Sequence, residues 1–347
     1  MEYSQLREML SALCPLPGPS GFERPVALRA AELMRPLVDE VSLDRMGNLV
    51  GVRRCGVPGA RKVLLDAHLD EIGLIVIGVD EGFLRFRAIG GVDPRVLPNQ
   101  EVTILTNPPL FGVVACLPPH VQRTGDSDKA VSVPDLFIDT GLKPDAAAAQ
   151  IPAGTPCVFR GGCFPLGQRQ MCGKSMDDRA CFVTLLRAAQ LLQGKKLDVD
   201  LYLLGSTREE VRYGGVVPAV WSLAPDCCVA VDVTHGKTPD SSKERTCDLG
   251  GGPAVGIGPN MTRWMTERML AKAKTADIPV QYEVMAGSSG TNGWDMQVAR
   301  EGIATSVLSL PLKYMHSPVE ALDLRDMEAV AALLAAFVEG IGEEALA

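Results

Sequence analysis

The sequence predicts one α/β domain that is interrupted by an inserted β domain. Apolar runs typical of buried strands alternate with helical patterns in both the first and the last part of the 347-residue chain. From about Asp70 to Gly162, short β-like runs alternate with Gly and Pro, and no convincing long helix separates them. Runs at this spacing are typical of a small barrel or sandwich.

The first elements follow from spacing and from turn residues. Apolar residues recur at helical spacing near the N-terminus, at Leu6, Met9, Leu10 and Leu13. A turn-rich loop over 17–26 leads into a helix expected over 27–37. Alternation around Asp44, followed by a turn at Gly47 and Asn48, predicts a hairpin.

The remaining elements show the same two patterns. Strands are expected over 62–65 and 74–79, and then, after the insert, around Leu201 and Val229 and over 280–284 and 304–308. Helices are expected over 178–192, 263–276 and 324–341, with a short helical turn in the insert at "PDAAAAQI".

Composition and charge argue against several classes of protein. A net charge of −8 and a pI near 5.2 disfavour a general nucleic-acid surface, which needs a basic patch. No run of about 18 apolar residues predicts a membrane span, and the charged N-terminus does not resemble a signal peptide. The ten cysteines are therefore expected to be free thiols in a cytoplasmic protein, and the absence of C-x-x-C spacing disfavours a structural zinc site.

Acidic and histidine side chains gather at five places in the sequence. Four of these places directly follow an apolar strand, and the fifth opens a helix. Ligands in open α/β sheets bind beyond the carboxyl ends of strands, which is the position of these four places. The residues are His68, Asp70 and Glu71; Asp177 and Asp178; Glu209 and Glu210; Asp232; and His316.

This pattern favours a metal centre over five unrelated loops. The chain has only four histidines, and two of them, His68 and His316, are in the set. Divalent zinc, cobalt or manganese accepts mixed histidine and carboxylate ligands, and two histidines with three carboxylates suffice for two ions that share one carboxylate. Each place alone is more often a solvated turn, a helix cap or a loop histidine, but five together are hard to explain as coincidences.

Spacing adds two details. His68 and Asp70 point to the same side of an extended chain, so Asp70 can hold the imidazole ring in place. Glu209 and Glu210 are adjacent and point opposite ways in an extended segment, so they need not share a role.

The same segments carry a resemblance to a known family. Along nearly the whole chain stand, in order, "PGPSGFE", "DRMGNLV", "AHLDEIGLIV", "GVVACLPPH", "GKSMDDR", "STREEVRYGG", "VDVTHG", "GGGPAVGIGPN", "SSGTNGWDMQVAREGIAT" and "YMHSPVE". This set is similar to the metallo-aminopeptidases of peptidase family forty-two, in the MH clan. Members of that family assemble into tetrahedral dodecamers, and some are labelled glutamyl aminopeptidase or endoglucanase.

The resemblance implies an architecture and a set of roles. A three-layer catalytic domain with a central mixed sheet would comprise residues 1–69 and 165–347, and a barrel-like insert over 70–164 would serve in assembly and in shaping the site. Two divalent ions per subunit, zinc or cobalt or else manganese, would be bound as follows: one by His68 and Asp232, the other by Glu210 and His316, with Asp177 bridging. Glu209 would be the general base that takes a proton from the metal-bound water, and Asp70 would orient His68.

One position departs from the family pattern. Members usually carry an acidic residue after Gly-Thr in the late glycine-rich loop, where this chain has Asn292, with Asp295 three residues further on. The change leaves the five implied ligands untouched, but it removes a negative charge and puts any inherited substrate preference in doubt. His120, in the insert, is expected to be a loop histidine, with contact to a neighbouring site as the alternative, and His235 either faces the cleft or faces solvent.

The function expected from this resemblance is that of an aminopeptidase acting on short peptides. A related dimetal deacylase or amidase would share the metal centre and differ in cleaving N-blocked substrates. A glycosidase is disfavoured because it needs two carboxylates and usually no metal, and an inactive scaffold is disfavoured because all the implied ligands and the base are present. No nucleic-acid or membrane partner is expected, and the resemblance implies a homo-oligomer, namely a dodecamer.

Overall fold

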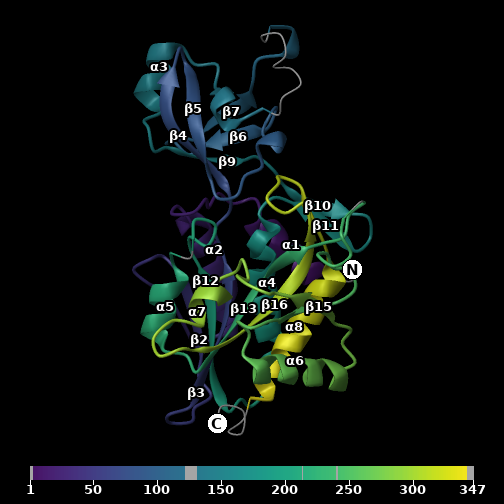
Figure 1. The fold of residues 1–347 in the computed structure, drawn as a ribbon. Helices are drawn as coiled ribbons and strands as arrows, with labels where there is room; N and C mark the ends of the chain where they lie inside the picture. Colours follow the sequence, from purple (N-terminus) through teal and green to yellow (C-terminus); the bar gives the residue numbers. More distant parts are fainter. Residues whose placement is uncertain (1–2, 122–130, 213, 240, 342–347) are drawn as a thin grey trace.

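The apolar runs of the sequence form the strands of one large mixed sheet. The structure is a computed structural model, and it describes residues 3–121, 131–212, 214–239 and 241–341 (Figure 1). The sheet has the order β1-β2-β12-β3-β13-β16-β17-β11-β10, and β14 pairs with both β16 and β15. The strands are β1 (Glu40–Leu43), β2 (Leu49–Arg53), β3 (Arg61–His68), β10 (Cys163–Leu166), β11 (Gln170–Gly173), β12 (Val199–Ser206), β13 (Cys227–His235), β14 (Ala254–Ile257), β15 (Gln281–Val284), β16 (Ala304–Lys313) and β17 (Glu320–Asp323).

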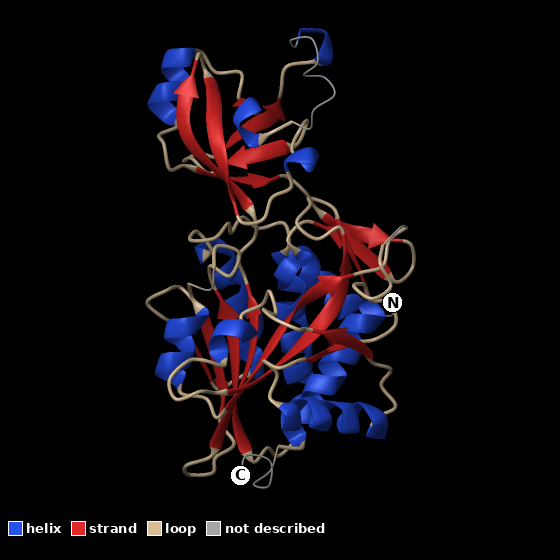
Figure 2. Cartoon of the chain, viewed as in Figure 1, coloured by secondary structure: helices blue, strands red, loops and turns tan. Residues whose placement is uncertain are grey.

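Helices cover both faces of this sheet, which gives three layers (Figure 2). On β3, Val63 and Leu65 belong to one apolar cluster and Leu64 to another, because successive side chains of a strand point to opposite faces. The first cluster receives apolar residues from α1 (Ser4–Leu13), α2 (Arg24–Met34), α4 (Met176–Leu192), α6 (Arg263–Thr275) and α8 (Leu324–Glu339). The second receives them from α5 (Val216–Leu223) and α7 (Gly293–Met296). The predicted three-layer α/β fold is confirmed.

The insert forms a separate closed barrel, drawn above the sheet domain in Figure 1. Its strand order is β4-β5-β8-β7-β6-β9, with neighbouring strands antiparallel. The elements are β4 (Gly73–Asp80), β5 (Phe83–Ile89), β6 (Glu101–Ile104), β7 (Leu110–Ala115), β8 (Phe137–Asp139), β9 (Pro156–Phe159) and α3 (Pro144–Gln150). The expected barrel is thus confirmed, and its strands fall inside 70–164, the range that we keep as the proposed domain boundary.

The hairpin predicted around Gly47 is formed by β1 and β2, and the helix expected over 27–37 is divided into α2 and a 3-10 turn. Four 3-10 turns are found in the described residues: η1 (Arg35–Leu37), η2 (Pro94–Val96), η3 (Pro119–Val121) and η4 (Val133–Asp135).

Helix α5 was not expected, because its sequence "VVPAVWSL" is rich in β-branched residues and contains Pro218. That proline lies in the first turn of the helix, where the missing N–H costs no hydrogen bond.

The centre of the sheet is parallel, and this positions the functional residues. Strands β12, β3, β13 and β16 run in the same direction, so their carboxyl ends meet at one edge. Ser206 pairs with His68, and Ala230 pairs with Asp66, which brings Asp232 level with His68. Among the helices of the described residues, none has the length and apolarity needed to cross a membrane.

Candidate metal centre

The predicted site residues meet at the carboxyl edge of the parallel strands. His68 is the last residue of β3, Asp232 lies in the C-terminal half of β13, and Asp177 lies in the first turn of α4. A cavity of about 290 Å³ is lined by all five predicted ligands and by the predicted base, together with Gly91, Arg212, Val233, Gly290 and Met315; the predicted residues are His68, Asp177, Glu209, Glu210, Asp232 and His316. The structure therefore brings together residues that lie up to 248 positions apart in the sequence (316 − 68).

Asp177 lies between the two histidines. Its Oδ1 atom is 3.1 Å from His68 Nε2, and its Oδ2 atom is 3.3 Å from His316 Nε2. Although burial raises the pKa of Asp177, hydrogen bonds from His316 and His68 hold that pKa below its ordinary value. One ionised carboxylate thus faces an imidazole with each of its two oxygens, which is the arrangement that a bridging ligand requires.

Glu209 and Glu210 approach different imidazole rings. Glu209 Oε2 lies 4.0 Å from His68 Nε2, whereas Glu210 Oε2 lies 3.3 Å from His316 Nε2. Burial raises the pKa of the Glu209 carboxyl to about 8; the nearby His68 opposes this rise and the Glu210 carboxylate adds to it. The two adjacent glutamates therefore occupy different environments, in agreement with the expectation that they need not share a role.

Asp70 lies behind both of these groups and is fully buried. Its backbone carbonyl is 3.2 Å and its Oδ1 atom 3.4 Å from His68 Nδ1. Its Oδ1 accepts a hydrogen bond from the Glu209 N–H, and its Oδ2 accepts from the Glu210 N–H and from the Ser20 hydroxyl. Asp70 thus contacts the His68 ring, and it also fixes the backbone of the glutamate pair, which the sequence did not indicate.

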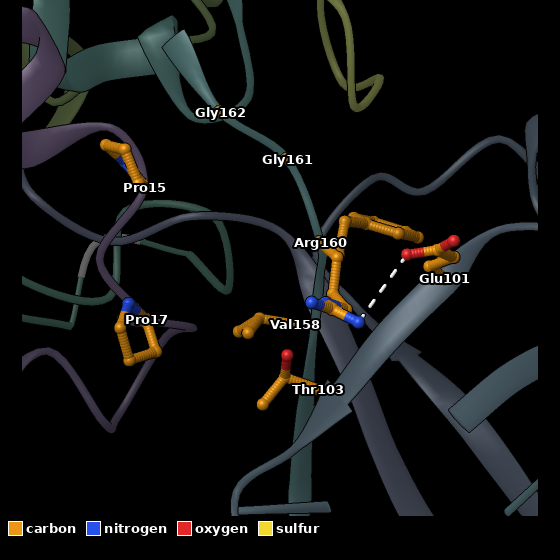
Figure 3. A pocket seen from close by; sticks show the side chains of 9 residues that line it. Pro15, Pro17, Glu101, Thr103, Val158, Arg160, Gly161 and Gly162 are labelled. Atoms are coloured by element: carbon orange, nitrogen blue, oxygen red, sulfur yellow. Dashed lines mark ion pairs between the residues drawn. The ribbon is translucent and has the colours of Figure 1, made fainter. Parts of the chain in front are cut away.

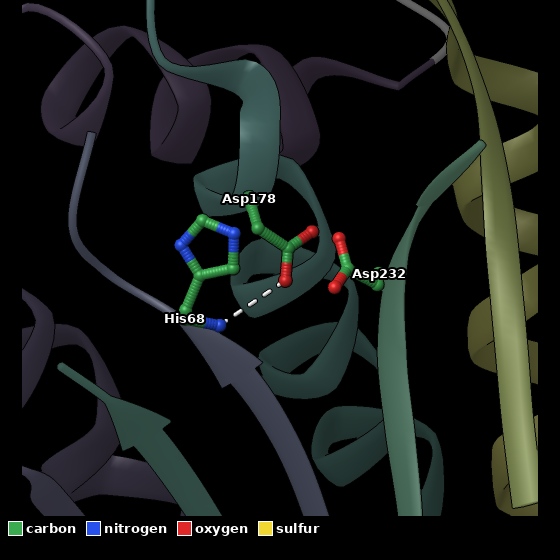
Figure 4. Close-up of side chains that lie close together, drawn as sticks. All are labelled: His68, Asp178 and Asp232. Atoms are coloured by element: carbon green, nitrogen blue, oxygen red, sulfur yellow. Dashed lines mark hydrogen bonds between the residues drawn. The ribbon is translucent and has the colours of Figure 1, made fainter. Parts of the chain in front are cut away.

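Asp178 is a member of the site that sequence reasoning had left without a role. It joins His68 and Asp232 in one of two groups whose potential ligand atoms lie within 4.8 Å of one another (Figure 4). The other group is His68, Asp177 and Glu210. Asp178 Oδ2 accepts a hydrogen bond of 3.1 Å from the His68 backbone N–H, while its Oδ1 is buried without a partner. Asp177 and Asp178 are 5% and 0% exposed, so neither is a solvated helix cap.

The donor set fits divalent cations. Burial raises the pKa of both Asp178 and Asp232, and neighbouring carboxylates raise each further. An unpaired carboxylate oxygen buried at this depth costs free energy unless a positive charge lies near it. Divalent ions held by imidazole nitrogens and carboxylate oxygens would offset this excess of negative charge.

The inserted barrel also reaches the cavity. Gly91, in the turn after β5, accepts a hydrogen bond of 3.0 Å through its carbonyl oxygen from His316 Nδ1. A Cβ atom at Gly91 would lie 2.7 Å from the same nitrogen, so a larger residue would displace the ring. The barrel therefore forms part of the wall beside His316.

A second hollow does not have this chemistry. It measures about 420 Å³ and lies where the N-terminal loop, with Pro15 and Pro17, faces the barrel (Figure 3). Of the described residues that line it, the charged ones are Arg160 and Glu101, and these form an ion pair of 3.6 Å with each other. It has no group of metal-binding side chains, so the smaller cavity is the candidate site.

Several acids and histidines singled out in the sequence lie away from the cavity. Glu71 forms buried ion pairs with Lys174 and Arg179. His120 and His235 are exposed. No short-range pattern distinguishes Glu71 from Asp70, because which of two adjacent side chains lies against His68 depends on the backbone.

Asn292 lies buried beside β3 and does not line the cavity. Its side-chain amide donates to Asp66 Oδ2 at 2.8 Å and to Ser206 Oγ at 2.9 Å. The asparagine that departs from the family pattern thus hydrogen-bonds to β3, the strand that ends at His68, and does not contact the cavity.

Replacing Asn292 with Ala is expected to lower the free energy of unfolding by about 1–3 kcal/mol, because the buried Asp66 carboxylate loses a donor. Denaturant unfolding would measure this. The matched control is Asn260→Ala, which removes an amide whose bond to Gly287 is exposed. Equal stabilities for the two variants would contradict the supporting role of Asn292.

Comparison with known proteins settles the family. A family model described as M42 glutamyl aminopeptidase matches residues 47–333. The chain belongs to this family. The M42 chain is 32% identical over 339 residues to a lysyl aminopeptidase of Pyrococcus furiosus, covering 96% of each protein.

Solved structures agree with this membership. The M42 chain is similar to aminopeptidase APDkam598 of the archaeon Desulfurococcus kamchatkensis, with 35% identity, a TM-score of 0.90 and coverage of 98% of this chain and 96% of that one. It is also similar to the TET1 peptidase of Pyrococcus horikoshii, with 28% identity, a TM-score of 0.85 and coverage of 97% and 100%. That peptidase is described as assembling into a tetrahedron or a large octahedral shell. M42 membership identifies the chain as a peptide hydrolase.

Proposed function

We propose that this chain is a dimetal aminopeptidase that removes N-terminal residues from short peptides. The observation that carries the proposal is the Asp177 carboxylate, whose two oxygens face His68 and His316 across one cavity. Membership of the M42 family supports hydrolysis at the N-termini of peptides. The two ions, their ligands and the roles of the acids are our inference from the geometry.

The proposed ligands divide into two groups around Asp177. One ion is assigned to His68 and Asp232, and the other to Glu210 and His316. The grouping of His68 with Asp232 supports the first assignment, and the 3.3 Å distance from His316 Nε2 to Glu210 Oε2 supports the second. Glu210 also lies in a group with His68 and Asp177, which is consistent with Asp177 being shared between the two ions. Zinc or cobalt suits the donor set best, and manganese is also compatible with it.

In this mechanism, two bound divalent ions supply Lewis acidity, which polarises the scissile carbonyl and makes an attacking water more acidic. Glu209 is assigned as the general base that accepts the proton of this water and returns it to the leaving amine. Its carboxylate lines the cavity beside His68 Nε2, and the Asp70 carboxylate holds its backbone N–H. Asp70 also holds the His68 ring, so one buried acid orients a proposed ligand and the base together.

We further propose that the chain forms a homo-oligomer, as a dodecamer. Support comes from the similar TET1 peptidase that is described as a tetrahedral or octahedral assembly, and from another similar solved structure that is described as a dodecamer. The barrel is the part proposed to serve in assembly while shaping the cavity through Gly91.

Removal of divalent ions is the decisive test of the proposed function. A chelator is expected to abolish hydrolysis of a panel of aminoacyl chromogenic substrates, and added cobalt or zinc is expected to restore it. Metal content is measured on the same samples. Full activity in protein shown to be free of metal would contradict the proposal.

N-blocked versions of the same substrates provide the control for reaction type. An aminopeptidase requires the free amine, so the blocked substrates should remain intact. Metal-dependent cleavage of the blocked forms at comparable rates would instead identify a deacylase or amidase. Hydrolysis of a glycoside that persists in the chelator would identify a glycosidase.

A further inference from the structure

Glu320 is a buried carboxylate that lies behind the proposed metal centre. It begins β17 and is 2% exposed. The short segment between β16 and β17, residues 314–319, carries His316, so the two antiparallel strands fix both ends of this segment. Glu320 does not line the 290 Å³ cavity, and the proposed ligand set does not include it.

The two oxygens of Glu320 bind two different segments of the chain. Oε2 accepts hydrogen bonds from the backbone N–H groups of Met176 at 2.7 Å and Asp177 at 3.1 Å. Oε1 accepts from the backbone N–H of His316 at 3.0 Å. One side chain thus joins the residue proposed to bridge the ions to a residue proposed to hold the second ion.

Both segments have backbone conformations that need such support. His316 has a φ of 61°, in the left-handed region that non-glycine residues adopt at a cost. At the start of α4, Asp177 has φ and ψ of −74° and 103°, which are not helical. Backbone N–H groups in the first turn of a helix have no partner within the helix. Glu320 supplies that partner from a distant strand.

We propose that Glu320 is a positioning residue that sets the separation between Asp177 and His316, and through it the affinity for the ion assigned to Glu210 and His316. This inference rests on the proposed dimetal function. The ion assigned to His68 and Asp232 is less affected, because Asp70 holds the His68 ring independently of Glu320.

Glu320→Gln is the sharpest variant because it keeps the shape of the side chain. A carboxylate accepts with both oxygens, whereas a glutamine amide has one oxygen and an NH₂ group that only donates. The amide oxygen can serve Met176 and Asp177, and the NH₂ group then faces the N–H of His316. The variant therefore releases His316 while keeping the helix start in place.

The experiment titrates metal-free wild-type and Glu320→Gln protein with cobalt, and measures bound metal after equilibrium dialysis. Wild-type protein is expected to bind two ions per chain. In the variant, one affinity should stay at the wild-type value and the other should fall by about 10–100-fold, the usual effect of losing a partner of a ligand. Peptidase activity should return at higher cobalt concentrations, with kcat close to that of the wild type.

Glu328→Gln provides the matched control. Glu328 pairs with Arg187 on the helix surface away from the cavity, so both affinities should remain unchanged. If Glu320→Gln fails to fold, the same titration is made on Glu320→Asp. The shorter side chain cannot reach both segments, so the separation between Asp177 and His316 is no longer fixed and the affinity assigned to Glu210 and His316 should fall.

The outcomes separate the two proposals. A wild-type chain that binds fewer than two ions contradicts the dimetal function itself. Two wild-type affinities in the variant, or an equal loss of both, contradict only the positioning role of Glu320. Activity that high cobalt does not restore also contradicts that role.

Discussion

Replacing Glu209 with Gln is expected to lower kcat by about 10²–10⁴-fold, because the amide cannot accept the proton of the attacking water. The two metal ions should still bind, since Glu209 is not one of the five proposed ligands. Steady-state kinetics on the best aminoacyl substrate, with metal analysis of the same preparation, would measure both effects. Substrate binding should change little, so the loss should appear in kcat more than in KM.

Glu301→Gln is the control, because it makes the same substitution at an exposed carboxylate that is outside the proposed site. It should keep wild-type kinetics. If Glu209→Gln kept full activity, the assignment of Glu209 as the base would be wrong. If the variant lost its metals as well, Glu209 would be a ligand instead.

Replacing Asp177 with Ala is expected to remove both ions, because this carboxylate is the group shared between His68 and His316. The loss of activity should exceed the roughly 10–100-fold that is typical when a group hydrogen-bonded to a metal ligand is removed. Metal stoichiometry and kcat/KM are measured in parallel. One tightly bound ion in Asp177→Ala would contradict the bridging assignment.

Asp177→Asn separates charge from shape at the same position. An asparagine offers one acceptor oxygen and one NH₂ group that only donates, so its side chain can bind only one of the two ions. We expect this variant to bind one ion well and the second weakly. Equal binding of both ions would show that the two oxygens do not act separately.

The sequence predicted the parts of the fold that depend on periodicity. Strand β3 and helix α8 have long, regular apolar patterns, and both lie where they were expected. Helix α5 escaped prediction because its β-branched residues and Pro218 imitate a strand. Its apolar residues belong to the same cluster as residues of β2 and β12, and local sequence spacing does not encode this association between distant segments.

The same contrast applies to the candidate site. His68 and Asp232 could be singled out because each follows an apolar run, and parallel strands bring such positions to one edge. Glu320 could not be, because its partners Met176 and Asp177 lie 144 and 143 positions away and are backbone groups without a sequence signature. The orientation of Asp178 likewise depends on irregular backbone angles at the start of α4.

The hydrogen bond from His316 Nδ1 to the Gly91 carbonyl joins a residue of the sheet domain to a turn of the barrel. A carbonyl oxygen only accepts, so this contact keeps a proton on Nδ1. In the neutral imidazole, the form that can hold a metal ion, the lone pair is then on Nε2, the nitrogen beside Asp177 and Glu210. The tautomer of a residue in the sheet domain is thus selected by a turn of the barrel. A rearrangement of the barrel that withdrew Gly91 would leave every predicted ligand in the chain and still change the basicity of one of them.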